Sequence, residues 1–300
     1  MIEKGEMNTY IIEGGIGKQV AFTAIINALV KKDKEKIQIF SPYVDIFGGN
    51  TNVKFALDAN TIPHHDKRII DSQNICFCEP YKANFIKGEQ HIIQSYCKLF
   101  GVKYEEYMRP KMFTDHYVSD AKRVAGDDKD FIVIQFSGGQ APAGFNPNNH
   151  YVSNDPTRNY NPFLAQKVID LIKGKHEDLK IINFGLPNEP NYKETEKPEL
   201  MPFAQWHEML KLPNCKGFIS TDSCLSHFAR SAGRKGVAIW GGTRWTQFGY
   251  KQNRNINKWW SEWDEWDNEK FDSQDPRNIM VDPEFVFEQF EKIYGKELIK

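Results

Sequence analysis

Short apolar runs alternate with helical patterns along the chain, and this alternation constrains the fold more than any other feature. The apolar runs lie at residues 10–12, 37–40, 53–57, 75–78, 131–136, 180–184, 217–220 and 236–240. Helical spacing of apolar residues falls between them at 19–30, 88–101, 163–173, 203–210 and 223–232. Strands that alternate with helices pair in parallel. The sequence therefore predicts two α/β domains, each with a parallel sheet.

A charged segment of small residues, AGDDKD at 125–130, separates the two halves. It precedes the strongest apolar run of the chain, so it is the expected linker. We predict a first domain over residues 1–127 and a second over 128–281.

Charge and cysteine content exclude some classes of protein. Lys+Arg 39 against Asp+Glu 40 gives a net charge of −1, which argues against a generally basic, nucleic-acid-coating protein. The five cysteines form no C-x-x-C pair, which favours a reduced, cytoplasmic protein. The start, MIEKGEMN, has no apolar signal region, and no segment reaches the ~18 apolar residues of a membrane span.

A glycine cluster, Gly14–Lys18, joins the first strand to the first helix. A P-loop would need glycine at the position of Ile12 and Ser or Thr at the position of Gln19. A dinucleotide fingerprint would need its third glycine where Val20 stands. Both phosphate motifs fail, so the cluster indicates a sharp turn or a close approach to the backbone.

Five loops follow predicted strands at the strand ends where parallel sheets bind ligands. They are Gly14–Lys18, Ser137–Gln140, Gly185–Glu189, Thr221–Ser223 and Gly241–Thr243. We expect these loops to line a cleft between the two domains.

The segment FISTDSCLSHFARSAGRKGVAIWGGTRWTQFGY, residues 218–250, carries the most specific pattern. A strand leads to Asp222 and Ser223, then His227 opens a helix of small residues, and a second strand ends at Gly241–Thr243. This order resembles the donor-binding segment of the heptosyltransferase-like family, glycosyltransferase family 9. A weaker likeness covers most of the chain, through GGIGKQVAFTAIINAL, FSPYVDIFGGNTNV, FIVIQFSGGQ and IINFGLPNE.

The resemblance implies the GT-B fold, in which two Rossmann-like parallel-sheet domains face a central cleft. It also implies that the amphipathic helix in 282–300, which opens with a proline, packs back on the first domain. The implied activity is a metal-independent, inverting transfer of a hexosyl, heptosyl or pentosyl group from a nucleotide-diphosphate sugar. That sugar is a co-substrate, and no cofactor is expected.

Loss of the diphosphate leaves negative charge, which helix N-termini and backbone N–H groups can stabilise without a metal. The D-x-D match, Asp128 to Asp130, precedes a strand and is expected to be a hydrated linker. The adjacent His64 and His65 diverge too much to ligate one ion together, so no metal site is expected.

Individual roles in the donor site follow from the resemblance. Asp222 is expected to bind sugar hydroxyls, His227 to bind a phosphate or to hold the loop in shape, Glu189 to bind a ribose diol, and Arg158 to add a cation. The alternatives are Asp222 as a helix N-cap, His227 as a packed core histidine and Glu189 as a surface charge. The full expected donor set is Ser137, Gly138, Gly139, Gln140, Arg158, Glu189, Thr221, Asp222, Ser223, His227, Gly241, Gly242 and Thr243.

The acceptor-side loop, with Gly14, Gly15 and Gly17, departs from the family pattern. The family has an aspartate after the last glycine as the favoured general base, whereas this chain has Lys18. Three explanations stay open: a substitute base, an anion-binding role for Lys18 toward the acceptor or the donor phosphates, or loss of catalysis. The substitute bases considered are Glu13 and Asp45, which we favour, and His64, His65 and Asp66.

The sequence does not identify the acceptor. Known members of the family extend the lipopolysaccharide core, but a pI of about 6.7 gives little support for an anionic membrane surface. GT-B enzymes of large bacteriophages glycosylate hydroxymethylated pyrimidines in DNA, and a phage protein would act in the host cytoplasm. DNA would need a basic groove, for which the first domain offers Lys18, Lys82, Lys87, Lys103, Arg109 and Lys111.

Two further functions remain as alternatives, a non-catalytic sugar-nucleotide-binding protein and a GT-B sugar-nucleotide epimerase. Four tryptophans at 259, 260, 263 and 266 share one helical face. They either pack on the donor domain or form a lid or platform on which a sugar or base stacks.

Overall fold

The computed structural model describes residues 8–60, 74–81, 90–126, 128–138, 155–185, 189–259, 272 and 274–294. The chain forms two compact units, Met1–Thr114 and Asp115–Lys300. The division lies earlier than the expected 127/128 boundary. Helix α5 (Val118–Ala125) packs against α7 (Phe203–Lys211), so it belongs to the second unit.

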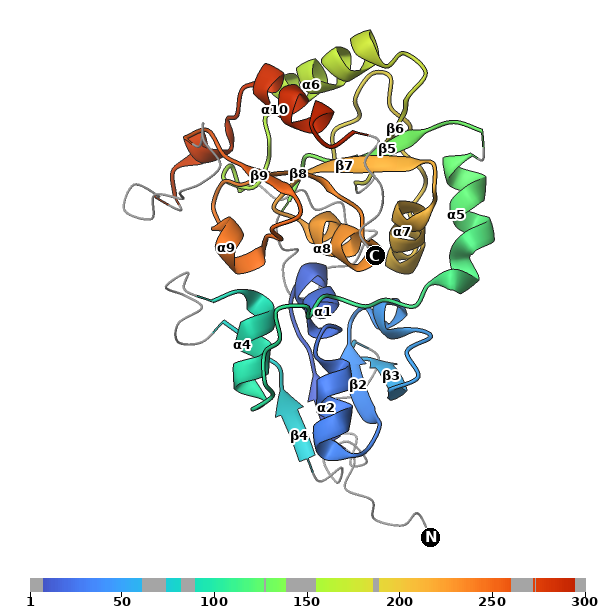
Figure 1. Ribbon diagram of the computed structural model, residues 1–300, viewed down its shortest axis with the longest axis vertical. Coiled ribbons are helices and arrows are strands. Elements are labelled where there is room, and N and C mark those ends of the chain that lie inside the picture. The colour runs from blue at the N-terminus through green and yellow to red at the C-terminus, as the bar shows by residue number, and fades with distance from the viewer. Residues whose placement is uncertain are drawn as a thin grey trace. The chain divides into compact units, whose positions relative to one another are not determined.

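The first unit contains a four-stranded parallel sheet in the order β3-β2-β1-β4. Its strands, at the four predicted runs, are β1 (Asn8–Ile11), β2 (Ile37–Ser41), β3 (Val53–Asp58) and β4 (Asn74–Phe77). Its described helices are α1 (Ile16–Phe22), α2 (Ile26–Asp33), the 3₁₀ turn η1 (Val44–Phe47) and α4 (Ile92–Leu99) (Figure 1). In this register Ile11 of β1 lies between Phe40 of β2 and Phe77 of β4.

The helix expected over 19–30 is instead two helices, α1 and α2, separated at Thr23. The Thr23 hydroxyl donates to the carbonyl of Val20 at 2.6 Å and accepts from the Lys111 amide at 2.8 Å. Backbone bonds here are of the tighter i→i+3 type, as from Thr23 N to Val20 O. A threonine that bonds the preceding turn and a distant amide interrupts the helix in a way that apolar spacing cannot reveal.

The ends of α4 match their sequence signals. His91 is the N-cap residue, with Nδ1 accepting from the Ile93 amide at 3.3 Å, and Gln94 completes a capping box. Gly101 follows the helix with φ of 60°, a conformation that favours glycine.

The second unit contains a five-stranded parallel sheet in the order β6-β5-β7-β8-β9. Its strands are β5 (Phe131–Gln135), β6 (Lys180–Asn183), β7 (Cys215–Thr221), β8 (Gly236–Ile239) and β9 (Arg254–Ile256). Strand β5 is buried throughout because strands flank it and helices cover both faces. Strand β9 was not predicted, because only one of its three residues, Ile256, is apolar. Its Asn255 accepts from Trp240 Nε1 at 3.0 Å.

Helices lie on both faces of this second sheet. Figure 1 shows α6 (Pro162–Lys175) and α10 (Pro283–Glu291) on one face, with α7 and α8 (Cys224–Ala232) on the other. The remaining short helices are η3 (Asp115–Tyr117), α9 (Trp245–Phe248) and η4 (Pro276–Ile279). The core joins Ile134, Ile219 and Val237 of the strands to Ile169 of α6.

The C-terminal helix differs from its expected position. Val286 and Phe290 of α10 are fully buried in the core of the second unit, where α10 packs against α6, β8 and β9. The described part of this helix therefore packs on the second unit, in place of the first domain that the resemblance implied.

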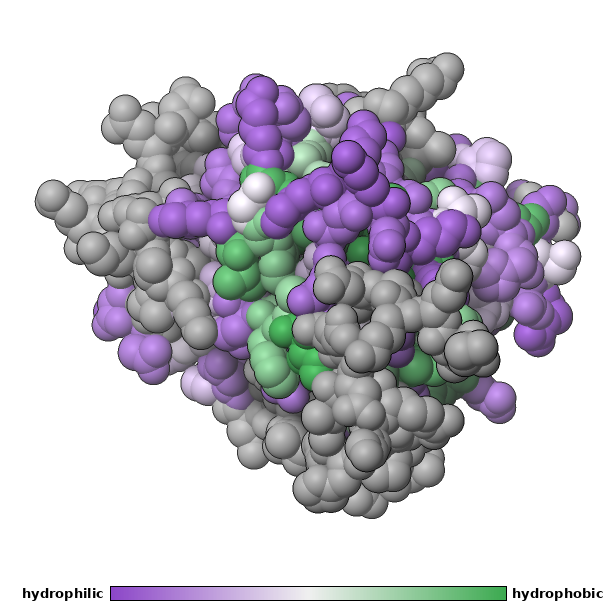
Figure 2. Space-filling view, turned by 90° about the horizontal axis from the view of Figure 1, so that it is seen from below, coloured by the Kyte–Doolittle hydropathy of each residue, from purple (hydrophilic) through white to green (hydrophobic). Residues whose placement is uncertain are grey.

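The remaining features of the fold are its surface and its cysteines. Among the coloured residues of Figure 2, hydrophilic side chains predominate and the hydrophobic ones gather in smaller areas. None of the described helices is both long and apolar enough to cross a membrane. All five cysteines are free thiols.

Candidate functional site

Four predicted loops of the second unit meet at one edge of its sheet, because β6, β5, β7 and β8 are adjacent and parallel. Ser137 and Gly138 follow β5, Gly185 and Glu189 follow β6, Asp222 follows β7, and Gly241–Thr243 follows β8. Gly139 and Gln140 lie outside the described residues.

Asp222 is the most connected residue of this edge. Its side chain is buried, and Oδ2 lies 3.1 Å from Arg158 Nη2 and accepts from the Thr243 hydroxyl. Arg158 Nη2 also donates to the Asp222 carbonyl at 2.9 Å. The N-cap of α8 is Ser223, without a side-chain capping bond, so the alternative role of Asp222 as an N-cap is wrong. Asp222 instead ties the end of β7 to Arg158 and to the loop after β8.

The segment before α6, which includes Thr157 and Arg158, passes very close to the two glycine turns that follow β5 and β8. Gly138 N donates to the Arg158 carbonyl at 3.1 Å, and Gly242 N donates to the Thr157 carbonyl at 2.9 Å. A Cβ on Gly241 would lie 1.9 Å from Thr157 O, and one on Gly138 would lie 2.5 Å from Asp222 O. The glycines therefore admit a neighbouring backbone, and their two N–H groups are bonded to it. This differs from the expected role of these N–H groups as free donors to a diphosphate.

Hydrogen-bonding capacity remains at the N-terminus of α8. The first N–H groups of a helix have no partner within the helix, and they form the positive end of its dipole. Among the described residues, Thr221 Oγ1, Ser223 Oγ and Arg158 Nε are buried and have no hydrogen-bond partner. An anion with several oxygens would satisfy all of these groups.

His227 lies in the first turns of α8 and is buried. Its Nδ1 lies 2.7 Å from the Tyr250 hydroxyl oxygen. Burial, and then the charge of Arg158, lower the pKa of His227 to about 4, so its ring is neutral near pH 7. Burial raises the pKa of Tyr250, which keeps its proton. The alternative of a packed histidine is therefore observed, and a role at a phosphate stays a prediction.

The buried histidines should make the fold sensitive to acid. Between pH 6.5 and about 4 the unfolded chain binds a proton at His227 that the folded chain excludes. Stability is then full above pH 6.5 and falls toward pH 4, by about 1.4 kcal/mol per pH unit for each such histidine. His207, whose pKa burial lowers to about 3, acts in the same direction. Urea unfolding at pH 7, 6 and 5 should show a shallower pH dependence in His227→Gln than in the wild type; equal slopes would contradict the assignment.

Glu189 lies beside the start of α8 and is not an isolated surface charge. Burial raises the pKa of the Cys224 thiol to about 12, and the negative charge of Glu189 is the second largest cause of this rise. A Cβ on Gly185 would lie 2.6 Å from Glu189 Oε2. Lys197 Nζ donates to the Glu189 carbonyl at 2.7 Å. The carboxylate thus faces the same edge as the α8 terminus, while its expected contact with a ribose stays a prediction.

In the first unit the glycine loop turns as expected. Gly14 has φ of 89°, and Gly15 is the N-cap residue of α1. Lys18 is buried, with Nζ 2.8 Å from Glu79 Oε2 and 4.7 Å from the centre of the Tyr81 ring. Glu79 was not among the predicted site residues, because a lone glutamate in FCEPY carries no spacing signal.

The other candidate bases have different positions. Glu13 is exposed after β1, and Asp45 lies in the first turn of η1 after β2. His64, His65 and Asp66 lie outside the described residues.

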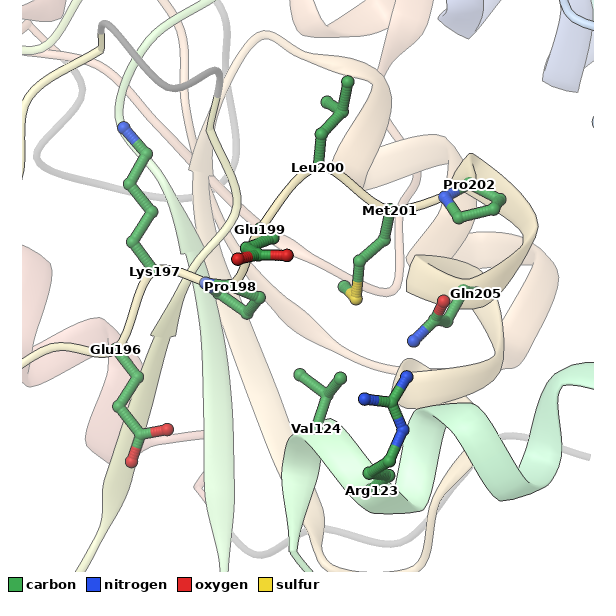
Figure 3. A pocket seen from close by; sticks show the side chains of 10 residues that line it. All are labelled: Arg123, Val124, Glu196, Lys197, Pro198, Glu199, Leu200, Met201, Pro202 and Gln205. Carbon is green, nitrogen blue, oxygen red and sulfur yellow. The ribbon is translucent and has the colours of Figure 1, made fainter.

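A cavity of about 600 Å³ lies elsewhere in the second unit (Figure 3). Its lining comes from α5, the segment before α7 and α7 itself: Arg123, Val124, Glu196, Lys197, Pro198, Glu199, Leu200, Met201, Pro202 and Gln205. Figure 3 shows the side chains of Arg123 and Gln205 pointing toward one another inside it. None of the predicted site residues lines this cavity, although its lining residue Lys197 donates to the Glu189 carbonyl at the edge around Asp222.

The described residues include no group of three His, Cys, Asp or Glu side chains that could hold a metal ion. Asp128 and Asp130 are exposed, and Asp130 Oδ1 lies 3.1 Å from Lys216 Nζ. Both residues lie within the second unit, so they are exposed as expected but do not link the two units. Of the four tryptophans, only Trp259 is described. Its Nε1 donates to Asn278 at 2.8 Å, and Lys258 and Arg277 lie 5.2 and 5.6 Å from its ring.

Solved structures of glycosyltransferases share this fold. A glycosyl transferase of family 9 from Veillonella parvula aligns with a TM-score of 0.67 and 13% identity, over 96% of this chain and 97% of that chain. The E. coli ADP-heptose lipopolysaccharide heptosyltransferase II gives 0.65 and 11%, over 96% and 98%. The dodecameric iron-containing heptosyltransferase TibC of enterotoxigenic E. coli, in complex with ADP-D-beta-D-heptose, gives 0.58 and 14%, over 83% and 62%.

No protein-family model and no curated protein sequence matches the chain. At identities of 11 to 14% the structural likeness shows the fold. The chain has the α/β fold of the heptosyltransferases, and the predicted resemblance to glycosyltransferase family 9 is confirmed at the level of the fold.

Proposed function

We propose that the chain is a glycosyltransferase that transfers a sugar from a nucleotide-diphosphate sugar to an acceptor hydroxyl. The observation that carries the proposal is the N-terminus of α8. There Arg158, Thr221 and Ser223 present buried donors that lack partners among the described residues. A leaving diphosphate needs this concentration of donors and positive charge. The fold shared with heptosyltransferases supports the same conclusion.

In this proposal Arg158 and α8 bind the diphosphate, Asp222 and Glu189 bind hydroxyls of the sugar and ribose, and no metal takes part. In the same proposal His227 Nδ1 accepts a hydrogen bond from the Tyr250 hydroxyl, so the neutral ring carries its proton on Nε2 and can donate it to a phosphate oxygen in a hydrogen bond. Because TibC is iron-containing, the metal-free mechanism needs its own test.

We favour a saccharide hydroxyl over a DNA base as acceptor. Of the six basic residues that a DNA groove would use, Lys82 and Lys87 lie outside the described residues. Two of the described four are ion-paired, Lys18 with Glu79 and Lys103 with Glu105. Two of these candidate cations are therefore already balanced by a carboxylate, which weakens the case for contacts to a DNA phosphate backbone. A cytoplasmic location, and a bacteriophage origin, belong to the same proposal and rest on the sequence alone.

A thermal-shift panel of ADP-, UDP-, GDP- and CMP-sugars tests the proposal. A ligand that binds only the folded chain at 100 times its Kd adds about 2.7 kcal/mol of stability, so one nucleotide class should raise the Tm by several degrees. Arg158→Leu should abolish the shift, and EDTA should leave it and turnover unchanged. A panel without any shift, or turnover that EDTA stops, would contradict the proposal.

The same panel separates the alternative functions. Binding with no release of nucleoside diphosphate in the presence of saccharide acceptors would indicate a binding protein. Conversion of the donor sugar to a stereoisomer without acceptor would indicate an epimerase.

A further inference from the structure

The pairing of Lys18 with Glu79 is an unusual feature of the first unit. Lys18 is in the first turn of α1, where the positive end of the helix dipole disfavours a cation. Its side chain is 5% exposed, and buried charges require a partner. Glu79 supplies that partner at 2.8 Å, and the Tyr96 hydroxyl donates to the Lys18 carbonyl at 3.2 Å. The buried ammonium group of Lys18 therefore holds the carboxylate of Glu79 in place.

Glu79 lies at the end of the sheet where ligands bind in parallel α/β folds. Strand β4 pairs with β1 so that Phe77 lies opposite Ile11, and Cys78 N donates to Ile11 O at 2.9 Å. Glu79 follows β4 by two residues, just as Glu13 follows β1 by two residues, and Glu79 Oε2 accepts from Lys18 of the glycine loop at 2.8 Å. The carboxylate therefore stands next to the loop that the sequence assigns to the acceptor.

The Glu79 carboxylate is both fixed and accessible. Oε2 accepts from Lys18 Nζ at 2.8 Å, and Oε1 accepts from the Tyr81 amide at 3.0 Å. A carboxylate has about four lone-pair sites, so two bonds leave room for a further donor. The side chain is 43% exposed. Glu13, by contrast, has no hydrogen bond or ion pair to any described residue, so its carboxylate is not held in one position.

We propose that Glu79 is the general base that takes the proton from the acceptor hydroxyl, an inference that rests on the proposed function. In this step the acceptor oxygen forms a bond to the anomeric carbon of the donor, and its O–H bond breaks with the proton passing to Glu79. The bond from the anomeric carbon to the diphosphate oxygen breaks, and its electron pair leaves with the nucleoside diphosphate. Because the charges of Lys18 and Glu79 cancel, this loop favours an uncharged, hydroxylated acceptor over an anionic one.

Glu79→Gln is the direct test, because the glutamine oxygen can still accept from Lys18 while the amide cannot take the proton. Release of nucleoside diphosphate from ADP-heptose, UDP-glucose and GDP-mannose would be measured, with water as acceptor. Wherever the wild type turns over a donor, the variant should be slower on the order of 10²–10⁴-fold. Its thermal shift with that donor should match the wild type. Glu105→Gln, which alters the exposed Lys103–Glu105 pair of the same unit, is the matched control and should keep the full rate.

Azide distinguishes a base from a structural residue, because this anionic nucleophile has no proton to lose. The double variant Lys18→Met/Glu79→Ala removes the buried cation together with its partner, so no lone charge is left behind. Azide should restore its nucleoside diphosphate release and yield a glycosyl azide. The proposal is overturned if Glu79→Gln keeps the wild-type rate, if azide restores nothing, or if Glu13→Gln or Asp45→Asn shows the loss instead. A wild type that neither binds nor turns over any donor would overturn the proposed function itself, and the base with it.

Discussion

Replacing Gly241 by alanine should destabilise the second unit more than any other single methyl addition at the donor edge. The new Cβ would lie 1.9 Å from Thr157 O and 2.9 Å from Ile279 Cβ. Backbone cannot rotate away as a side chain can, so the turn after β8 and the segment around Thr157 must separate. Overpacking of this kind costs about 1–3 kcal/mol and more where backbone must move, so we expect a loss of about 3 kcal/mol or more.

The same change should also remove nucleotide-sugar binding. The Thr157 segment carries Arg158, and its position depends on the bond from Gly242 N to Thr157 O. Urea unfolding and a thermal-shift titration with the nucleotide sugar would measure both effects. Gly174→Ala in α6 is the matched control, since a Cβ there meets nothing within 4 Å and alanine favours a helix. Equal unfolding midpoints for Gly241→Ala and the wild type would show that the close approach is not as described.

Elements governed by local patterns could be predicted from the sequence. The buried run at 131–136 is β5, and the amphipathic pattern at 203–210 is α7. The pattern around Asp222 correctly predicted the end of β7, the start of α8 and the strand β8, because burial and small residues determine all three. Their parallel order then brought the loops after β5, β7 and β8 together without further information.

Contacts between residues distant in sequence could not be predicted. Lys18 and Glu79 meet only because β4 pairs with β1, and Tyr250 meets His227 only because the chain returns past α8. The first unit ends at Thr114 rather than at residue 127, because α5 packs on α7. This tertiary contact outweighs the linker-like composition of AGDDKD.

The glycines at the edge around Asp222 have an immediate structural role that the sequence did not indicate. Gly138 and Gly242 belong to the expected donor set, whereas their N–H groups bond the segment that carries Arg158. The glycines thus position the Arg158 side chain beside Asp222, and in the proposed function Arg158 and the N-terminus of α8 bind the diphosphate.

Asp222→Ala should separate two roles of this carboxylate, holding Arg158 and recognising the donor sugar. Removing one partner of a buried ion pair costs about 3–5 kcal/mol, and since the Arg158 side chain is 26% exposed we expect a smaller loss, about 2–3 kcal/mol. Asp222→Asn keeps the volume and an oxygen that can accept from Thr243, so its loss should be smaller still. Urea unfolding of the two variants measures this first role.

The second role appears in the difference between two ligands. Freed from Asp222, Arg158 has more capacity for phosphate, so Asp222→Ala should bind the bare nucleoside diphosphate at least as tightly as the wild type. Its preference for the nucleotide sugar over that diphosphate should fall about 10- to 100-fold, because a hydrogen bond to a charged group contributes about 1.5–3 kcal/mol. Isothermal titration with both ligands measures the preference. If both affinities fall by the same factor, Asp222 only positions Arg158, and the donor sugar is recognised by other residues.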